Sequence, residues 1–255
     1  MQAPTERFSD RVADYVRYRP SYPEAVFDLL ARRCGLAPGT VVADIGAGTG
    51  IFSQLLLQRG ARVFAVEPNA GMRAAAERLL AHQPNLTSVA GTAEDSGLPD
   101  AAVDLITAAQ AFHWFDRSKA RAEFMRILKP GGHLALIWNE REVQTTPFLQ
   151  AYERLLQNYA PEYGVVDHRH ISVTDVAAFF QPGRVEFAAF PYSQQFDYPG
   201  LKGRLLSSSY APAAGHPNHE PMLAELRAIF DRYQASGRVV WHYRTRVFYG
   251  RLANQ

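Results

Sequence analysis

The chain has 255 residues and a formal net charge of +2, and 47% of its residues are hydrophobic. This composition is typical of a folded globular protein and excludes extended disorder, while the length suits one α/β domain or two small ones. The 27 basic residues are balanced by 25 acidic ones and form no clustered run, so we expect no nucleic-acid-binding surface.

Three further features bear on where the protein works. The sequence has no stretch of about 18 uncharged apolar residues, which argues against a transmembrane helix. Residues 1–10 are polar and do not resemble a secretion signal. Cys34 is the only cysteine, so no intrachain disulfide can form. We therefore expect a cytoplasmic protein in which Cys34 fills part of the core.

From residue 40 onward, short apolar runs alternate with longer amphipathic segments. The apolar runs predict five buried strands, at 40–45, 61–66, 86–90, 103–109 and 133–138. The amphipathic segments predict helices at 50–58, 69–81 and 116–128, of which the last two are capped by Asn69 and Asp116. Strands that alternate with helices predict a doubly wound α/β fold with a parallel sheet and right-handed crossovers.

The segment before the first strand has a different character. Residues 1–36 look helical but are broken at Pro20 and Pro23. We expect this segment to form a helical lid over the central part of the chain, 40–140.

The C-terminal part contains longer strands. Two alternating segments, 184–196 and 238–251, predict an antiparallel pair that closes one edge of the sheet. The segments 141–182 and 197–236 would then form a cap over the top of the sheet and supply the acceptor site. On this interpretation residues 1–255 form a single domain.

A glycine-rich loop follows the first predicted strand. Gly46, Gly48 and Gly50 allow the backbone to turn sharply and to approach a ligand closely, and the following helix directs free N–H groups toward it. The spacing is G-x-G-x-G, whereas a dinucleotide-binding fingerprint requires G-x-G-x-x-G. Asp44 stands just before the glycines and would repel a pyrophosphate. The loop therefore favours a ligand with an amino acid group over one with phosphates.

Acidic residues follow the next two strands. Glu67 ends the second strand, where a carboxylate can accept hydrogen bonds from both hydroxyls of a ribose. Glu94 follows the third strand and can accept a hydrogen bond from the exocyclic amine of adenine. We prefer Glu94 to Asp95 for this role.

These motifs together resemble those of the class I S-adenosylmethionine-dependent methyltransferases. The resemblance covers roughly 10–140 and implies a Rossmann-like sheet of seven strands, mostly parallel, with an antiparallel C-terminal strand. It rests on Val42–Gly50, Glu67, Ala93–Glu94, Val103–Ala109 and Leu128–Gly132. Within the family, the chain is similar to a small-molecule group that includes ubiquinone/menaquinone-biosynthesis and trans-aconitate methyltransferases. That likeness is carried by Phe8–Ser9, Tyr15, Tyr18–Pro23 and Gln110–Phe115.

The resemblance implies a set of residues that bind S-adenosylmethionine and its product S-adenosylhomocysteine. The glycine loop would pass under the methionine part, Glu67 would hold the ribose, and Met72 would pack on the adenine. Tyr18 and Arg19 would cover the site and reach the methionine carboxylate. The other expected cofactor residues are Asp44, Gly46, Ala47, Gly48, Gly50, Pro68, Ala93, Glu94 and Gln110.

Methyl transfer from a sulfonium is a direct displacement, so the enzyme mainly aligns the reactants and excludes water. A general base is needed only where the acceptor is protonated at neutral pH. His113 is the candidate base, because an imidazole titrates near neutral pH. The alternative, which we favour, is that His113 forms a hydrogen bond with the cofactor or the backbone and moves no proton. Trp114, Asn139 and Tyr210 are candidates for binding the acceptor, and the pattern predicts no metal site.

The leading hypothesis is methyl transfer to a small organic acceptor. Three alternatives remain open: an NAD-dependent oxidoreductase, a protein that binds the cofactor without turnover, and methylation of tRNA or protein. A deep apolar pocket would indicate a quinone-like or lipid acceptor, whereas an arginine-lined pocket would indicate a carboxylate.

Overall fold

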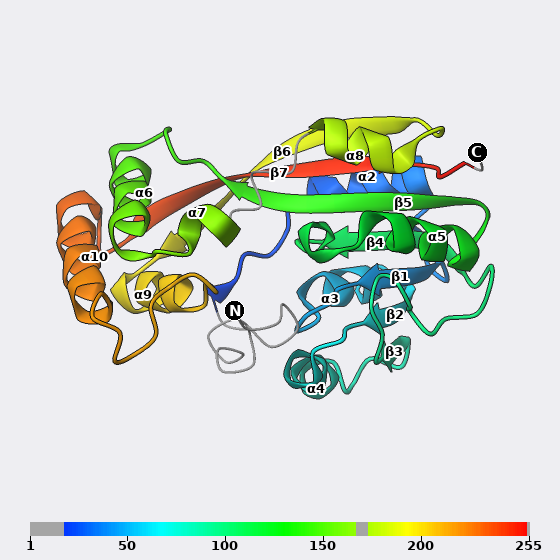
Figure 1. The fold of residues 1–255 in the computed structure, drawn as a ribbon, viewed down its shortest axis with the longest axis horizontal. Helices are drawn as coiled ribbons and strands as arrows, with labels where there is room; N and C mark the ends of the chain where they lie inside the picture. Colours follow the sequence, from blue (N-terminus) through cyan, green and yellow to red (C-terminus); the bar gives the residue numbers. More distant parts are fainter. Residues whose placement is uncertain (1–17, 167–172, 254–255) are drawn as a thin grey trace.

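The computed structural model describes residues 18–166 and 173–253. Residues 1–17 of the predicted lid (1–36) therefore lie outside the described residues. The central feature is a seven-stranded sheet with the order β3-β2-β1-β4-β5-β7-β6 (Figure 1). Its strands are β1 Val41–Ile45, β2 Arg62–Val66, β3 Leu86–Val89, β4 Val103–Ala109, β5 Leu128–Arg141, β6 Val185–Phe196 and β7 Val239–Gly250.

Strands β1 to β5 run parallel, and β7 runs antiparallel to its neighbours β5 and β6. The predicted fold class is confirmed, including the antiparallel pair formed by the two long C-terminal strands. The strand order reverses between β1 and β4. In doubly wound sheets, ligands bind at the carboxyl ends of the strands on either side of such a reversal.

Helices cover both faces of the sheet. Alternate residues of each strand point to opposite sides, and apolar residues on both sides form a core under each layer of helices. Ala43 and Ile106 belong to one apolar core, and their neighbours Val42 and Leu105 belong to another. The first core is closed by α5 (Arg117–Ile127) and α8 (Val173–Phe180), and the second by α2 (Glu24–Cys34) and α3 (Ile51–Leu57).

The predicted helix caps are present. The Asn69 side chain accepts a hydrogen bond from the Met72 N–H at the start of α4 (Ala70–Leu79), and the Asp116 side chain accepts one from the Lys119 N–H. The fifth strand differs from its prediction, because β5 begins directly after α5. Leu128 already pairs with Val103 of β4, and a register shift follows.

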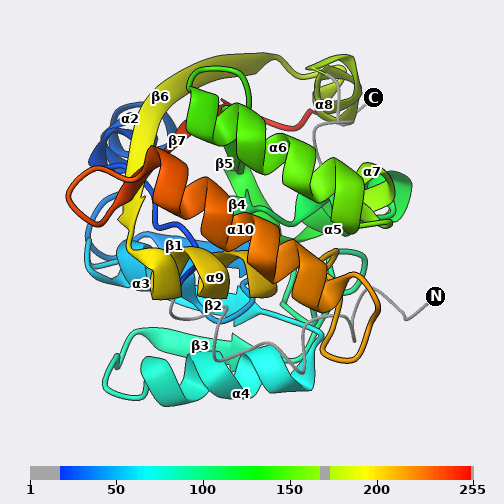
Figure 2. The ribbon, with the colours of Figure 1, turned by 90° about the vertical axis from the view of Figure 1, so that its left-hand side faces the viewer.

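A cap packs on the C-terminal end of β6 and the N-terminal end of β7, beyond the parallel strands (Figures 1 and 2). It has its own apolar core, to which Val239, Trp241 and Tyr243 of β7 contribute. Its helices are α6 Pro147–Tyr159, α7 Tyr163–Val166, α9 Tyr198–Leu206 and α10 His219–Tyr233. Only part of the predicted cap segment 141–182 lies here, since α8 packs on the sheet instead.

Two simpler expectations concern the core and the membrane. Cys34 is 3% exposed, and burial raises the pKa of its thiol to about 12. Within the described residues, every helix is too short or too polar to cross a membrane.

Candidate functional site

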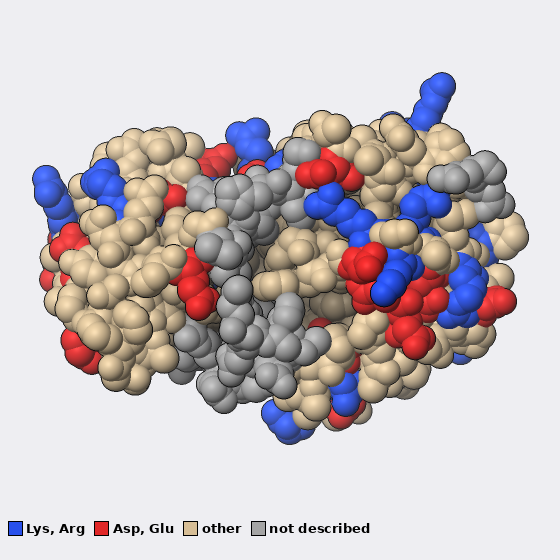
Figure 3. Space-filling view, viewed as in Figure 1, with Lys and Arg blue, Asp and Glu red and all other residues tan. Residues whose placement is uncertain are grey.

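A cavity of about 350 Å³ opens at the carboxyl ends of β1, β2 and β4, on the side of the cap. Figure 3 shows the surface hollowed between the sheet and the cap. Its volume is within the range of small-molecule sites. Fifteen of the residues expected at the site line it: Arg19, Asp44, Gly46, Ala47, Gly48, Glu67, Pro68, Met72, Ala93, Glu94, Gln110, His113, Trp114, Asn139 and Tyr210.

The glycine loop forms one wall of the cavity. Gly46 has a φ of +69°, and a Cβ built on it would lie 2.5 Å from the Cβ of Ala111. Gly48 has a φ of +59°, and its Cβ would meet only the Met72 sulfur, at 3.8 Å. Position 46 therefore requires glycine for packing, whereas position 48 leaves open space beside the backbone where a ligand can lie.

Two expected cofactor residues lie outside the cavity lining. Gly50, with a φ of +83°, precedes the first residue of α3, and its Cβ would meet the Leu80 side chain at 2.8 Å. It therefore serves the packing of α3 against the end of α4. The Tyr18 ring packs against Gly203 of α9, where a Cβ would lie 2.0 Å from the ring.

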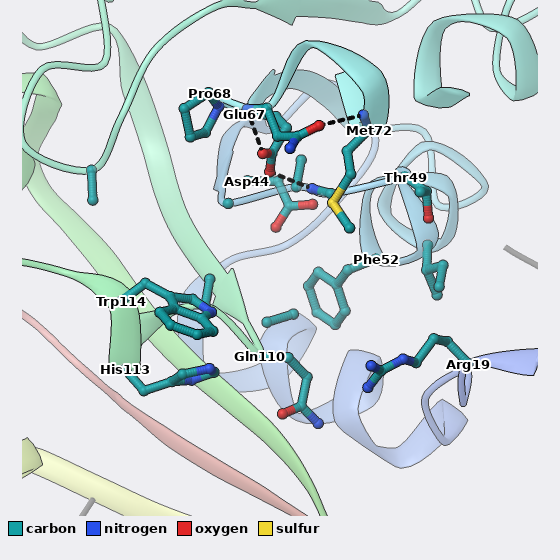
Figure 4. Close-up of a pocket in the computed structure, with 18 of the residues that line it drawn as sticks. Arg19, Asp44, Thr49, Phe52, Glu67, Pro68, Met72, Gln110, His113 and Trp114 are labelled. Atoms are coloured by element: carbon teal, nitrogen blue, oxygen red, sulfur yellow. Dashed lines mark hydrogen bonds between the residues drawn. The ribbon is translucent and has the colours of Figure 1, made fainter. Parts of the chain in front are cut away.

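Glu67 ties the glycine loop to the end of β2. One carboxylate oxygen accepts a hydrogen bond from the Gly48 N–H at 2.9 Å, and the other accepts from the Asn69 N–H at 2.8 Å (Figure 4). Burial raises the pKa of Glu67, and these two backbone hydrogen bonds oppose that rise. Each oxygen keeps a second lone pair, so the carboxylate can still accept hydrogen bonds from a ligand.

Asp44 lines the cavity but is held within the protein. It is 1% exposed, and its two carboxylate oxygens accept hydrogen bonds from the Ser53 hydroxyl at 2.6 Å and the Thr107 hydroxyl at 2.9 Å. Burial raises its pKa to about 6, although both hydroxyls oppose the shift. Asp44 thus fastens β1 to α3 and β4 beneath the glycine loop.

The loop after β3 supplies the next part of the wall. Ala93 and Glu94 line the cavity, whereas Asp95 does not. One Glu94 oxygen accepts a hydrogen bond from the Asp116 N–H at 2.8 Å. Met72, which is 4% exposed, faces the same region from the first turn of α4.

The segment after β4 forms the opposite wall (Figure 4). Gln110 has a φ of +59°, and its side-chain amide donates a hydrogen bond to the Asn139 carbonyl at 3.1 Å. His113 and Trp114 belong to a 3-10 helix, Phe112–Trp114, and their ring centroids are 4.8 Å apart. The irregular backbone thus turns a polar and two aromatic side chains toward the cavity.

Hydrogen bonds join the N-terminal segment to both the sheet and the cap. The Asn139 amide donates to the Ser21 carbonyl at 2.9 Å and accepts from the Thr245 hydroxyl at 2.6 Å. The Arg19 guanidinium donates to the Ser207 carbonyl at 2.9 Å. Asn139 is therefore used within the fold, which reduces its capacity to bind an acceptor.

Sequence reasoning missed several residues that line the cavity. Arg204 of α9 is 8% exposed and faces the cavity beside Tyr210. Arg204 follows the apolar Leu201 by three residues, so both lie on the same face of the helix. This spacing was the sequence feature that could have indicated a buried position for Arg204. The Thr49 hydroxyl is buried and has no hydrogen-bond partner among the described residues. Further residues on the sheet side line the cavity and were not predicted: Ile51, Phe52, Asn69, Thr92, Ala109 and Ala111.

These features fit a nucleoside that carries an amino acid group. Space beside the Gly48 backbone is open to a ligand, and the Glu67 carboxylate keeps lone pairs that can accept hydrogen bonds. The buried Thr49 hydroxyl has no hydrogen-bond partner among the described residues. Buried polar atoms without partners in the protein commonly bond to a ligand or to water. No group of acidic, histidine or cysteine side chains in the described ranges has the arrangement of a metal site.

Comparisons with known proteins agree with this fit. Residues 43–136 match a family described as a methyltransferase domain. A methyltransferase-like protein of Schizosaccharomyces pombe is 30% identical over 254 residues, which cover 97% of this chain and 96% of that protein. A methyltransferase of Mycobacterium tuberculosis (strain H37Rv) is 42% identical over 135 residues, or 53% of each chain.

Solved structures show the same fold. A type II methyltransferase structure from Anaeromyxobacter dehalogenans has a TM-score of 0.68 and 26% identity, and the match covers 93% of this chain and 100% of that one. Phosphoethanolamine N-methyltransferase 2 of Haemonchus contortus, solved with S-adenosyl-L-methionine, has a TM-score of 0.56 at 15% identity, covering 98% of this chain and 57% of that one. The latter likeness concerns the fold alone. The chain belongs to the family of class I S-adenosylmethionine-dependent methyltransferases.

Proposed function

We propose that the protein transfers a methyl group from S-adenosylmethionine to a small organic acceptor. The observation that carries the proposal is the pairing of the open Gly48 backbone with the Glu67 carboxylate in one cavity. The methyltransferase relatives support transfer chemistry and disfavour the NAD-dependent alternative. The described chain would then act as one methyltransferase domain whose cap completes the acceptor side.

The residues that would hold the cofactor come from four loops at the carboxyl ends of the strands. Gly46, Ala47 and Gly48 would support the methionine part, and Glu67 with Pro68 would hold the ribose. The remaining contacts would come from Arg19, Met72, Ala93, Glu94 and Gln110. Thr49 would join this set, because its buried hydroxyl has no hydrogen-bond partner in the described part of the chain.

When bound, S-adenosylmethionine would supply a methyl group already activated by the sulfonium. The residues of this chain would position the acceptor and exclude water from it. Trp114 and Tyr210 would form the walls on the acceptor side. His113 would accept a proton where the acceptor is a hydroxyl or an amine, and for an acceptor that is already anionic it would only donate or accept a hydrogen bond.

Ligand-induced thermal stabilisation tests the cofactor. We expect S-adenosylhomocysteine to raise the melting temperature and NAD to leave it unchanged, because a ligand that binds only the folded state stabilises it. Stabilisation by NAD alone would contradict the proposal. Incubation with methyl-labelled cofactor and a metabolite extract then separates an enzyme from a protein that binds the cofactor without turnover, since only the enzyme transfers label.

A further inference from the structure

Two arginines are buried together in the cap, next to the acceptor side of the cavity. Arg141 stands at the end of β5 and Arg204 on α9. Their guanidinium carbons lie 5.6 Å and 5.3 Å from the centre of the same Trp241 ring. Arg204 also lines the cavity, with Tyr210 from the loop that follows α9. Positive charge therefore reaches the cavity from the cap side.

Arg141 is neutralised within the protein. Its guanidinium forms an ion pair with Glu153 and donates a hydrogen bond to the Tyr163 hydroxyl at 2.7 Å. Both partners of the ion pair are buried, with 11% and 9% of their side chains exposed. Glu153 is thus committed to Arg141 and provides the counter-charge for that arginine.

Arg204 has only neutral partners. Its Nε donates to the Tyr243 hydroxyl at 3.4 Å, and its Nη1 donates to the Ser208 hydroxyl at 3.1 Å. Among the described residues, no carboxylate lies within 4.0 Å of its guanidinium, and its Nη2 makes no hydrogen bond. Arg204, Arg141 and Glu153 together therefore carry one positive charge in excess.

An arginine stays ionised in a protein, and a buried charge without a partner is costly. An anionic ligand would offset that cost, and a carboxylate matches the planar fork of a guanidinium. At the opposite end of the cavity stand Asp44, Glu67 and Glu94, which would repel an anion. A ligand with one anionic group would thus be oriented with that group toward α9.

Resting on the proposed function, we propose that the methyl acceptor carries a carboxylate, which Arg204 binds through its free Nη2 edge. The same side chain then selects acidic acceptors over neutral ones such as quinones. Tyr210 is close enough to both arginines to interact with them electrostatically, and its hydroxyl would donate to the same carboxylate.

The test works with an acceptor whose identity is unknown. A metabolite extract is separated on an anion-exchange resin at pH 8, and each fraction is incubated with the protein and methyl-labelled S-adenosylmethionine. We expect label to enter compounds from the retained, anionic fraction. The Arg204→Met variant should lower this transfer on the order of 100-fold, because it removes a charge-assisted hydrogen bond. Transfer by Arg204→Lys should lie between that of the wild type and that of Arg204→Met. Lysine keeps the positive charge but lacks the planar guanidinium that pairs with a carboxylate.

Two controls separate this proposal from the proposed function. Binding of S-adenosylhomocysteine is measured for each variant and should be unchanged in Arg204→Met. Arg232→Gln removes an exposed arginine of α10 and should leave the transfer unchanged. Label entering only the unretained fraction, or equal transfer by wild type and Arg204→Met, would overturn the proposal.

If no fraction is labelled although S-adenosylhomocysteine binds, the transfer activity itself is contradicted. Citrate and glutarate are then titrated into the complex with S-adenosylhomocysteine. Binding that Arg204→Met abolishes supports a carboxylate site. Binding that is equal or undetectable in both proteins overturns it.

Discussion

Buried charge is held in different ways at the sheet end of the cavity and in the cap beside its other end. At the sheet end, Asp44 and Glu67 are buried carboxylates whose oxygens accept hydrogen bonds from hydroxyl or backbone donors. At the cap end, Arg141 has an acidic partner, whereas Arg204 has only two hydroxyls. The buried carboxylates at the sheet end have protein partners before a ligand arrives, whereas the Arg204 charge at the cap end has no acidic partner.

This difference indicates a division of labour. Preorganised carboxylates at fixed positions suit a cofactor that is the same in every turnover. A cation without a counter-charge suits a ligand that brings the charge with it. Substitutions at each end can test this division separately.

Glu153→Gln should give the largest change, at the cap end. It leaves the Arg141 charge buried without its partner, and we expect the free energy of unfolding to fall by about 4 kcal/mol. Urea denaturation measures it. Asp231→Asn is the matched control, because its ion pair with Arg227 is about half exposed and should contribute less than about 1 kcal/mol. An equal fall in the free energy of unfolding in the two variants would show that the buried ion pair contributes no more than the exposed one.

At the sheet end, Glu67→Gln should weaken S-adenosylhomocysteine binding on the order of 100-fold, because charge-assisted hydrogen bonds are lost. Isothermal titration calorimetry gives the dissociation constant. Glu77→Gln provides a control on the exposed side of α4, where the carboxylate accepts a hydrogen bond from Ser88. An unchanged dissociation constant in Glu67→Gln would show that this carboxylate does not bind the ribose.

Asp44 should make the stability depend on pH. Its folded-state pKa of about 6 lies above the unfolded value of 3.8, so the folded protein binds this proton more tightly. The contribution is complete below pH 3.8 and is lost as the pH rises through 6. Between pH 4.5 and 7 we expect the free energy of unfolding to fall by about 2 kcal/mol from this group.

Urea denaturation of wild type and Asp44→Asn at both pH values isolates the contribution of Asp44. The raised pKa of Glu67 also makes the free energy of unfolding fall as the pH rises, and it does so in both proteins. The hydrogen bonds from Arg126 and Ser96 lower the pKa of Glu123 to about 2, so Glu123 changes the stability only at lower pH. An identical pH dependence in the two proteins would contradict the assignment.

Alanine at Gly46 and Gly48 should separate packing from binding, with the smallest effect of the series. Both substitutions strain a positive φ, but only Gly46→Ala also meets the Ala111 Cβ. We expect Gly46→Ala to be less stable than Gly48→Ala by about 1 kcal/mol. Gly48→Ala should mainly weaken S-adenosylhomocysteine binding. Gly131→Ala, with a φ of +79° and no atom near its Cβ, measures strain alone. Equal stability of the two cavity variants would refute the packing role.

Much of the sheet end was predictable, because its signals are local in the sequence. Strand, glycine loop and helix follow one another directly, and Glu67 closes the next strand. Two residues of the motifs nevertheless lie elsewhere: Gly50 packs against Leu80, and Tyr18 against Gly203. Helix packing decides both positions, and the spacing of residues does not reveal it.

Tyr210 was named from the sequence, but the arginine pair at the cap end was not predictable, because its members are distant in the sequence. Arg141 and Arg204 come from a strand end and a helix, and only the fold brings both to Trp241. Arg141 and Trp241 lie on the parts of β5 and β7 that extend beyond the parallel strands, and Arg204 of α9 packs against Trp241 there. The early start of β5 depends likewise on pairing with Val103, which no local pattern indicates.

The most direct measurement is a crystal structure of the protein with S-adenosylhomocysteine. We predict the ribose hydroxyls within hydrogen-bond distance of the Glu67 carboxylate and the amino acid group beside Gly46 and Gly48. We also predict open space between the sulfur and Arg204. A ligand bound outside this cavity, or a ribose that makes no contact with Glu67, would contradict the account.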